Sequence, residues 1–133
     1  MSPIYSHRID VRFRDCDPLG HVNHAVYLTS LERARRHCCR ALWRFGEARS
    51  SIPGVIMARA EIDYRRPAQY GETLEIRISL AAIGRTSFTY DYEILDEANA
   101  LVASARTVQV MYDYEAAKPV PIPDDVRQKM RES

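Results

Sequence analysis

The densest group of polar residues lies in the loop DCDPLGHVNH, which spans residues 15–24. Within ten residues it holds two carboxylates, two imidazoles and one side-chain amide. A carboxylate held beside a carbonyl can activate water as a general base, or it can attack the carbonyl itself. These residue types therefore point to hydrolytic or acyl-transfer chemistry in this loop.

A long helix is predicted directly after the loop, because apolar residues recur at steps of three and four. The apolar stripe consists of Tyr27, Leu31, Ala34, Cys38, Leu42 and Phe45. Gly46 is expected to end the helix after about 20 residues. The first turn of a helix presents unpaired N–H groups and a partial positive charge, which stabilise the oxyanion of acyl transfer.

The same loop also fits a purely structural role. Asp15, Asp17 or Asn23 can cap the helix, since Asp and Asn are good capping residues. His21 and His24 can be hydrogen-bonded structural residues. Spacing alone does not separate capping from catalysis.

Alternating apolar and polar residues predict five strands, one before the helix and four after it. These strands are Ile9–Phe13, Val55–Tyr64, Thr73–Ala82, Ser87–Leu95 and Leu101–Tyr114. The short turns between them predict a largely antiparallel sheet, and Asp124–Arg131 is expected to form a short terminal helix. Because a helix of this length must be covered, one curved sheet is expected to wrap it in an α+β domain.

Composition indicates a single domain over residues 1–133 and narrows its partners. The net charge of +1 gives no electrostatic reason to expect nucleic acid or an anionic membrane. No apolar run approaches the roughly 20 residues that span a bilayer, and no signal peptide is recognisable, so a cytoplasmic location is expected.

Cysteines and arginines are the remaining composition signals. Cys16, Cys38 and Cys39 form no metal-type pair and are expected to be buried or half-buried free thiols. All cations except Lys118 and Lys129 are arginines, which suit anion binding but can also reflect genome composition. The arginines of the helix lie off its apolar stripe and are expected to form a solvated face.

Several enzyme classes are excluded because the sequence has no GxSxG, HExxH, P-loop or GxGxxG motif. His37, Cys38 and Cys39 are adjacent in the predicted helix, where neighbours point about 100° apart and cannot meet one ion. No metal site is expected.

The segment VRFRDCDPLGHVNHAVYLTSLERAR, residues 11–35, resembles the signature of hotdog-fold acyl-CoA thioesterases of the 4-hydroxybenzoyl-CoA thioesterase and YbgC-like family. Residues 62–76 and 83–94 resemble the family's second and third blocks, and residues 118–123 its ending. The resemblance covers nearly the whole chain. It implies the hotdog fold, in which a long central helix is wrapped by a curved antiparallel sheet of about five strands.

The resemblance also implies roles for individual residues. Asp17 matches the catalytic carboxylate, which leaves Asp15 as a structural one. The backbone N–H of His24 matches the group that polarises the thioester carbonyl, and Asn23 or the His24 ring would orient the thioester or water. Gly54 matches a glycine whose backbone lies near the carbonyl, or it is simply a turn glycine.

Substrate contacts are implied in the same way. Arg85, Thr86 and Ser87 match a turn that contacts CoA phosphates, although an ordinary hairpin end would look the same. Tyr27 is a candidate for the acyl pocket or an ordinary core residue. No cofactor is expected apart from CoA as part of the substrate. The family forms its site between subunits, so a homodimer or homotetramer is expected.

Two other functions remain open at this stage. A hotdog-fold enoyl-CoA hydratase also uses an Asp and a His near a helix start, and the DPLGH run superficially resembles its loop, but no Asn precedes Pro18. A non-catalytic module that binds acyl-CoA or acyl-carrier protein would be expected to lose the carboxylate that Asp17 supplies.

Overall fold

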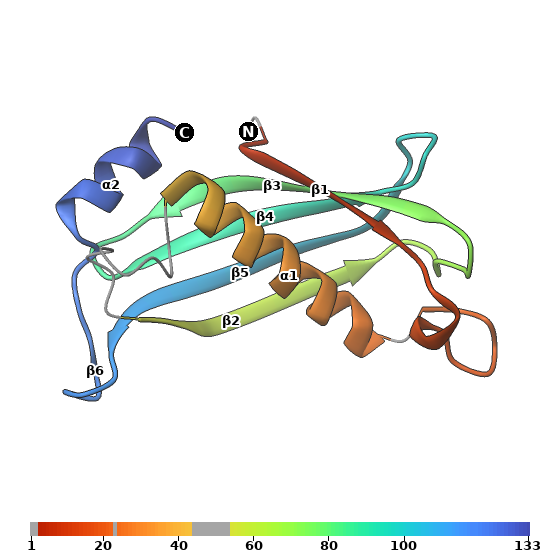
Figure 1. Ribbon diagram of the computed structural model, residues 1–133, viewed down its shortest axis with the longest axis horizontal. Coiled ribbons are helices and arrows are strands. Elements are labelled where there is room, and N and C mark those ends of the chain that lie inside the picture. The colour runs from red at the N-terminus through yellow and green to blue at the C-terminus, as the bar shows by residue number, and fades with distance from the viewer. Residues whose placement is uncertain (1–2, 23, 44–53) are drawn as a thin grey trace.

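A computed structural model describes residues 3–22, 24–43 and 54–133 (Figure 1). A long helix, α1 (His24–Trp43), lies across one face of a curved antiparallel sheet, and a short helix, α2 (Asp124–Arg131), follows the last strand. The strands are β1 (Tyr5–Asp10), β2 (Val55–Tyr64), β3 (Thr73–Ile83), β4 (Ser87–Leu95), β5 (Leu101–Asp113) and β6 (Lys118–Pro119).

The sheet has the order β1-β3-β4-β5-β2, and β6 pairs with β5. Every pairing is antiparallel, as the short turns predict. β2, β4 and α2 have the predicted bounds, whereas β3 is one residue longer and β5 one residue shorter than predicted. β2 and β1 form the two edges of the five-strand path, which matters below because β2 lies beside the open flank of α1.

The predicted first strand, Ile9–Phe13, is wrong in its position. β1 ends at Asp10, and Phe13 begins a 3-10 turn with its side chain 80% exposed. The cause is the Asp15 carboxylate, which accepts hydrogen bonds from the backbone N–H of Arg12 at 2.9 Å and from its guanidinium at 3.2 Å. These bonds close the chain into a turn, although the apolar alternation continues through Phe13.

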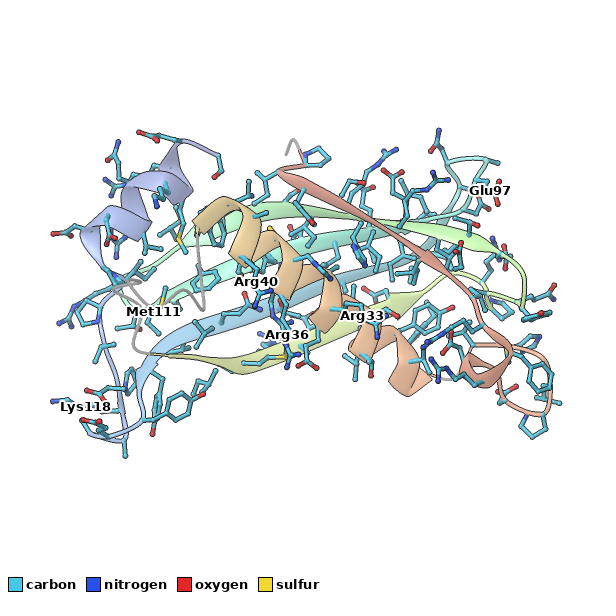
Figure 2. All side chains as sticks on the ribbon, in the orientation of Figure 1. Arg33, Arg36, Arg40, Glu97, Met111 and Lys118 are labelled. Atoms are coloured by element: carbon cyan, nitrogen blue, oxygen red, sulfur yellow. The ribbon has the colours of Figure 1, made fainter. Side chains whose placement is uncertain are left out.

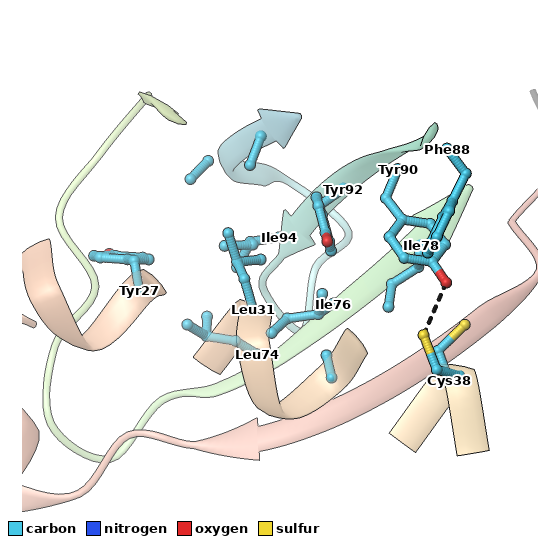
Figure 3. Packing of buried hydrophobic residues seen from close by; sticks show 14 of the residues in the cluster. Tyr27, Leu31, Cys38, Leu74, Ile76, Ile78, Phe88, Tyr90, Tyr92 and Ile94 are labelled. Atoms are coloured by element: carbon cyan, nitrogen blue, oxygen red, sulfur yellow. Dashed lines mark hydrogen bonds between the residues drawn. The ribbon is translucent and has the colours of Figure 1, made fainter. Parts of the chain in front are cut away.

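The core lies between α1 and the sheet (Figure 3). The predicted helix stripe is buried at Tyr27, Leu31, Ala34 and Cys38, and Leu42 is half-buried. Phe45 and Gly46 lie outside the described residues. From the sheet, the inward residues of β3 and β4 meet this stripe: Leu74, Ile76, Ile78, Phe88, Tyr90, Tyr92 and Ile94.

The cysteines are free, buried at Cys38 and Cys39 and half-buried at Cys16, as predicted. Burial raises the pKa of Cys38 to about 12 and that of Cys39 to about 11. Cys39 Sγ lies 3.1 Å from the hydroxyl of Tyr90. Both buried sulfurs therefore stay thiols and act as small packing groups.

Of the helices that the structure describes, none is both long enough and apolar enough to cross a membrane. The described residues also bring no three His, Cys, Asp or Glu side chains together as metal ligands would lie.

Candidate active site

The Asp17 carboxylate is held by its own loop. Its Oδ1 accepts the backbone N–H of Leu19 at 2.9 Å and that of His21 at 3.3 Å. The backbone of Asp17 donates to the His21 carbonyl at 2.8 Å, and Gly20, with a φ of 80°, donates to the Asp17 carbonyl at 2.9 Å. Among the described residues Oδ2 has no hydrogen-bond partner, so one carboxylate oxygen is fixed and the other is available.

The loop is anchored to the turn between β2 and β3. Val22 donates its N–H to the Ala68 carbonyl at 2.9 Å, and His21 and Gln69 form an isolated antiparallel bridge. Glu72 Oε2 accepts the N–H of Gln69 at 2.7 Å. Asp17 is therefore positioned by a network that extends into the turn between β2 and β3, not by the loop alone.

α1 begins at His24, directly after the loop. Its first N–H groups have no partner inside the helix, so this end can stabilise a developing oxyanion. Asn23 and the side chain of His24 lie outside the described residues. The backbone position expected for the oxyanion donor is thus at the helix start, and the two predicted side-chain roles stay predictions.

The contacts of Asp15 indicate a structural role, because its carboxylate is bound by Arg12. Burial raises the pKa of Asp15, but the hydrogen bonds and charge of Arg12 outweigh burial and lower it overall. Within the described residues, Asp15 accepts from Arg12, and Asp17 accepts from Leu19 and His21. Among these contacts neither carboxylate accepts from the first turn of α1, and capping by Asp15, Asp17 or Asn23 stays an alternative.

Gly54 lies at the start of β2, beside the end of β5. The Gly54 carbonyl accepts the N–H of Tyr112 at 3.0 Å. On the other side of β5, the backbone carbonyl of Thr86 accepts the N–H of Met111 at 2.8 Å. A side chain at Gly54 would collide with the Tyr114 ring and would approach the Tyr112 carbonyl to 2.9 Å. Close packing of backbone and ring requires a glycine here.

The turn at residues 84–87 presents Arg85 to solvent. The Arg85 carbonyl accepts the N–H of Ile122 at 2.9 Å and the Nη2 of Arg127 at 3.0 Å. These bonds fix the backbone, and the Arg85 guanidinium forms no ion pair with any described residue. Thr86 and Ser87 are half-buried beside it.

One chain does not bring all the predicted catalytic residues together. Tyr27, in the first turn of α1, packs against Tyr64 at the end of β2, with ring centroids 5.1 Å apart. Gly54 precedes the start of β2, and α1 has 20 residues, or about 30 Å. Asp17 and His24 therefore lie at one end of the helix, and Gly54 with residues 85–87 at the other (Figure 1).

The model of the thioesterase-like superfamily matches residues 11–130. This chain belongs to that superfamily. A 1,4-dihydroxy-2-naphthoyl-CoA hydrolase of Synechococcus elongatus is 33% identical over 118 residues, covering 86% of this chain and 85% of the relative. The acyl-CoA thioester hydrolase YbgC of Escherichia coli is 27% identical and covers 89% of each chain.

Solved thioesterase structures agree with this assignment. A Thermus thermophilus thioesterase complexed with coenzyme A and Zn is 32% identical, with a TM-score of 0.82 and coverage of 98% of this chain and 99% of that chain. A predicted thioesterase from Bacillus stearothermophilus is 27% identical, with a TM-score of 0.85 and coverage of 96% and 94%. The predicted family, hotdog fold and thioester-hydrolase class are confirmed.

Tyr27 has a packing role in this thioesterase. Its ring is 3% exposed, its hydroxyl accepts the N–H of Ala68 at 3.3 Å, and burial raises its pKa. It thereby joins the helix start to the turn that anchors the Asp17 loop. Contact with the acyl group stays a prediction.

A groove of about 870 Å³, not predicted from the sequence, separates α1 from β2. α1 packs most closely against β1 and β3, which leaves its other flank open. Arg33, Arg36 and Arg40 lie along this flank of the thioesterase helix (Figure 2). They are exposed as predicted, but they border a groove of the size that holds small ligands.

Proposed function

We propose that this thioesterase hydrolyses an acyl-CoA thioester to the free acid and CoA, with Asp17 as general base or nucleophile. The observation that carries this role is the state of its carboxylate. Oδ1 is held by two backbone N–H groups, at 2.9 and 3.3 Å, while Oδ2 has no partner among the described residues. An oriented, available carboxylate oxygen in the loop that leads into α1 suits acyl transfer at the helix start.

Two chemical routes use the same geometry. As a base, Asp17 takes a proton from water, which attacks the thioester carbonyl. As a nucleophile, Asp17 attacks the carbonyl, CoA leaves as its thiolate, and water then opens the mixed anhydride to release the acid. In both routes the N–H of His24 and the helix dipole stabilise the oxyanion. A thiolate with a parent pKa near roughly 8.5 leaves with little help from an acid.

We further propose that the working site forms between two subunits. β2 is an edge strand, and Met57 and Tyr64 on it are 42% and 40% exposed. Its outer row of backbone groups can pair with the same strand of a second copy in an isologous dimer. Because antiparallel pairing sets the start of one β2 against the end of the other, Gly54 of the partner subunit would approach Asp17.

The same pairing would add a CoA site from the partner. Residues 85–87 lie at the Gly54 end of each chain, so the partner subunit's Arg85 would come to the same side of the site as Asp17. A guanidinium that pairs with no acidic side chain of the described residues, together with two neighbouring hydroxyls, suits CoA phosphates. A homodimer is the smallest assembly that completes this site, and a homotetramer would contain it twice.

The test is thiol release from short, long and aromatic acyl-CoAs by the wild-type protein, Asp17→Asn and Glu97→Gln. Glu97 is exposed in the turn between β4 and β5 and serves as the matched charge control. Loss of the carboxylate should lower kcat by about 10²–10⁴-fold, with Glu97→Gln unchanged. Near-full activity of a folded Asp17→Asn protein would refute the role of Asp17. Single-turnover hydrolysis in ¹⁸O-labelled water, with mass analysis of Asp17, separates nucleophile from base.

A further inference from the structure

Arg127, on α2, reaches the turn that carries Arg85. Its Nη2 donates to the Arg85 carbonyl at 3.0 Å, and the backbone N–H of Ile122 donates to the same oxygen at 2.9 Å. The neighbours of Arg127 on α2, Val126 and Met130, are buried, and α2 packs against α1 and β3. Arg127 is therefore held at this turn by the docking of a whole helix (Figure 1).

The contact brings a second cation to the turn. Arg85 is exposed and Arg127 is half-buried, and within the described ranges neither guanidinium has an acidic partner. A guanidinium carries five N–H donors, and the Arg85 carbonyl uses one of those of Arg127. The charge and the remaining donors of Arg127 are thus left for an anion, such as a phosphate.

Backbone hydrogen bonds arrange the predicted binding residues in a fixed order. The carbonyls of Gly54 and Thr86 bind opposite sides of β5, with N–O distances of 3.0 and 2.8 Å. Arg85 directly precedes Thr86, and Arg127 is bound to Arg85 from α2, which packs on β3 beyond the turn. From the β2 edge outward, the order is therefore Gly54, Arg85, Arg127.

A CoA thioester carries its functional groups in a matching order. The thioester is at one end, the pyrophosphate follows the pantetheine arm, and the 3′-phosphate stands on the ribose beyond it. In the proposed dimer the thioester lies between Asp17 of one chain and Gly54 of the partner subunit. The rest of the molecule would then extend from the β2 edge across the turn toward α2, so its nearer phosphates meet Arg85 and its farthest one meets Arg127.

We propose that Arg127 binds the 3′-phosphate of CoA while Arg85 binds the pyrophosphate, so that α2 selects thioesters whose carrier bears the 3′-phosphate. This assignment rests on the proposed thioesterase function and names the part of the substrate that the enzyme reads outside the acyl group. Arg127 is a binding residue and not a catalytic one, because the 3′-phosphate takes no part in the bonds that react.

The experiment compares two thioesters of one acyl group, the CoA ester and the dephospho-CoA ester, which differ only in the 3′-phosphate. The wild-type protein should show a kcat/KM about 10-fold higher for the CoA ester. The difference should lie in KM with kcat nearly unchanged, since a group remote from the reaction is bound equally in the ground state and the transition state. A ratio near one would overturn the assignment while leaving the hydrolysis intact.

Variants then assign the preference to Arg127. Arg127→Gln keeps an N–H donor for the Arg85 carbonyl but loses the charge, so it should raise KM for the CoA ester alone and bring the ratio to near one. Arg127→Lys should keep part of the preference, and Arg85→Gln should raise KM for both esters because both carry the pyrophosphate. Arg8→Gln, exposed on β1, is the matched charge control and should behave as the wild type. An equal rise in KM for both esters in Arg127→Gln would show that Arg127 only holds the turn and would contradict the proposal.

Binding separates this proposal from the proposed hydrolysis. Calorimetric titration of the wild-type and Arg127→Gln proteins with free CoA and with dephospho-CoA measures the discrimination without turnover. Binding of CoA about 10-fold tighter than that of dephospho-CoA, lost in Arg127→Gln, supports the 3′-phosphate site even if Asp17 has another role. Equal affinities in the wild-type protein, or no measurable binding of either compound, would overturn it even if Asp17 is confirmed as the catalytic carboxylate.

Discussion

Arg66 and Glu72 form a bidentate ion pair: Nη2 of Arg66 lies 2.7 Å from Oε1 of Glu72, and Nη1 lies 3.1 Å from Oε2. The same guanidinium reaches Asp96 Oδ2 at 3.0 Å. Glu72 also accepts the N–H of Gln69. Gln69 in turn forms an isolated antiparallel β-bridge with His21 in the Asp17 loop. The pair therefore braces the turn that holds the candidate catalytic loop.

Glu72→Gln is expected to destabilise the protein in a pH-dependent way. Hydrogen bonds from Arg66 are the largest cause of the lowered pKa of Glu72, whose ordinary value is 4.5. The folded state thus favours the charged carboxylate, and its stabilisation is present above about pH 4.5 and lost as the pH falls through the lowered pKa. Since both side chains are partly exposed, the loss in unfolding free energy near neutral pH should be about 1 kcal/mol.

Urea unfolding of the wild-type and Glu72→Gln proteins at about pH 7 and about pH 3 measures this difference. Glu97→Gln, which lies in an exposed turn, should match the wild-type protein at both pH values. If Glu72→Gln were equally destabilised at acid and neutral pH, the charge of Glu72 would not be the source of its contribution.

The stacked pair of His7 and His37 predicts a second pH dependence. Their ring centroids are 5.0 Å apart with an angle of 18° between the rings. Burial, then the charges of His37 and Arg33, lower the pKa of His7 from its ordinary 6.5. The unfolded chain then binds the proton more readily, so stability falls as the pH drops below about 6.5 toward the lowered pKa. His7→Gln should flatten the unfolding free energy measured between about pH 8 and about pH 5.5; an unchanged slope would exclude His7 as its source.

The sequence was sufficient for the fold because each element carried its own local pattern. The 3.6-residue period of α1 and the two-residue period of β3 to β5 each specify a buried face, whereas no residue of the edge strand β2 is buried. The first strand was misplaced because a side-chain contact, Asp15 with Arg12, ends the extended chain where the apolar alternation does not. Alternation alone contains no information about such a contact.

The groove depended on long-range packing and was therefore missed. Arg35 and Gln109 belong to elements far apart in the chain. The groove exists because α1 packs against β1 and β3 and leaves space between its other flank and β2. One local signal was present. Thr107, Gln109 and Met111 occupy the inward positions of β5, so Gln109 is a polar residue at a core position of the predicted strand.

Gly54→Ala is expected to destabilise β2 at its first residues. The added methyl group would collide with the Tyr114 ring and press against the Tyr112 carbonyl, at 2.9 Å. The ring can move but the carbonyl belongs to the sheet, so unfolding free energy should fall by about 1–3 kcal/mol. Thermal unfolding of Gly54→Ala, and of Gly54→Ala combined with Tyr114→Ala, measures the two parts. Removing the ring should recover part of the loss; no loss in the single variant would mean that the close approach is relaxed in solution.

Ala58→Pro is expected to weaken the proposed dimer. The register of β2 against β5 shifts between Met57 and Arg59, so Ala58 has no partner in β5. Proline there removes one backbone N–H at an irregular position of an edge strand, and its fixed φ would disturb the edge that the proposed dimer pairs. Ala58→Ser keeps the N–H and is the matched control.

Sedimentation velocity over a range of concentrations measures the dimer dissociation constant. The wild-type and serine proteins should be dimers, and the dissociation constant of the proline variant should be at least about 10-fold higher. Because the site needs Gly54 of the partner subunit, thiol release should fall with the dimer fraction; a fully active monomer would contradict the shared site.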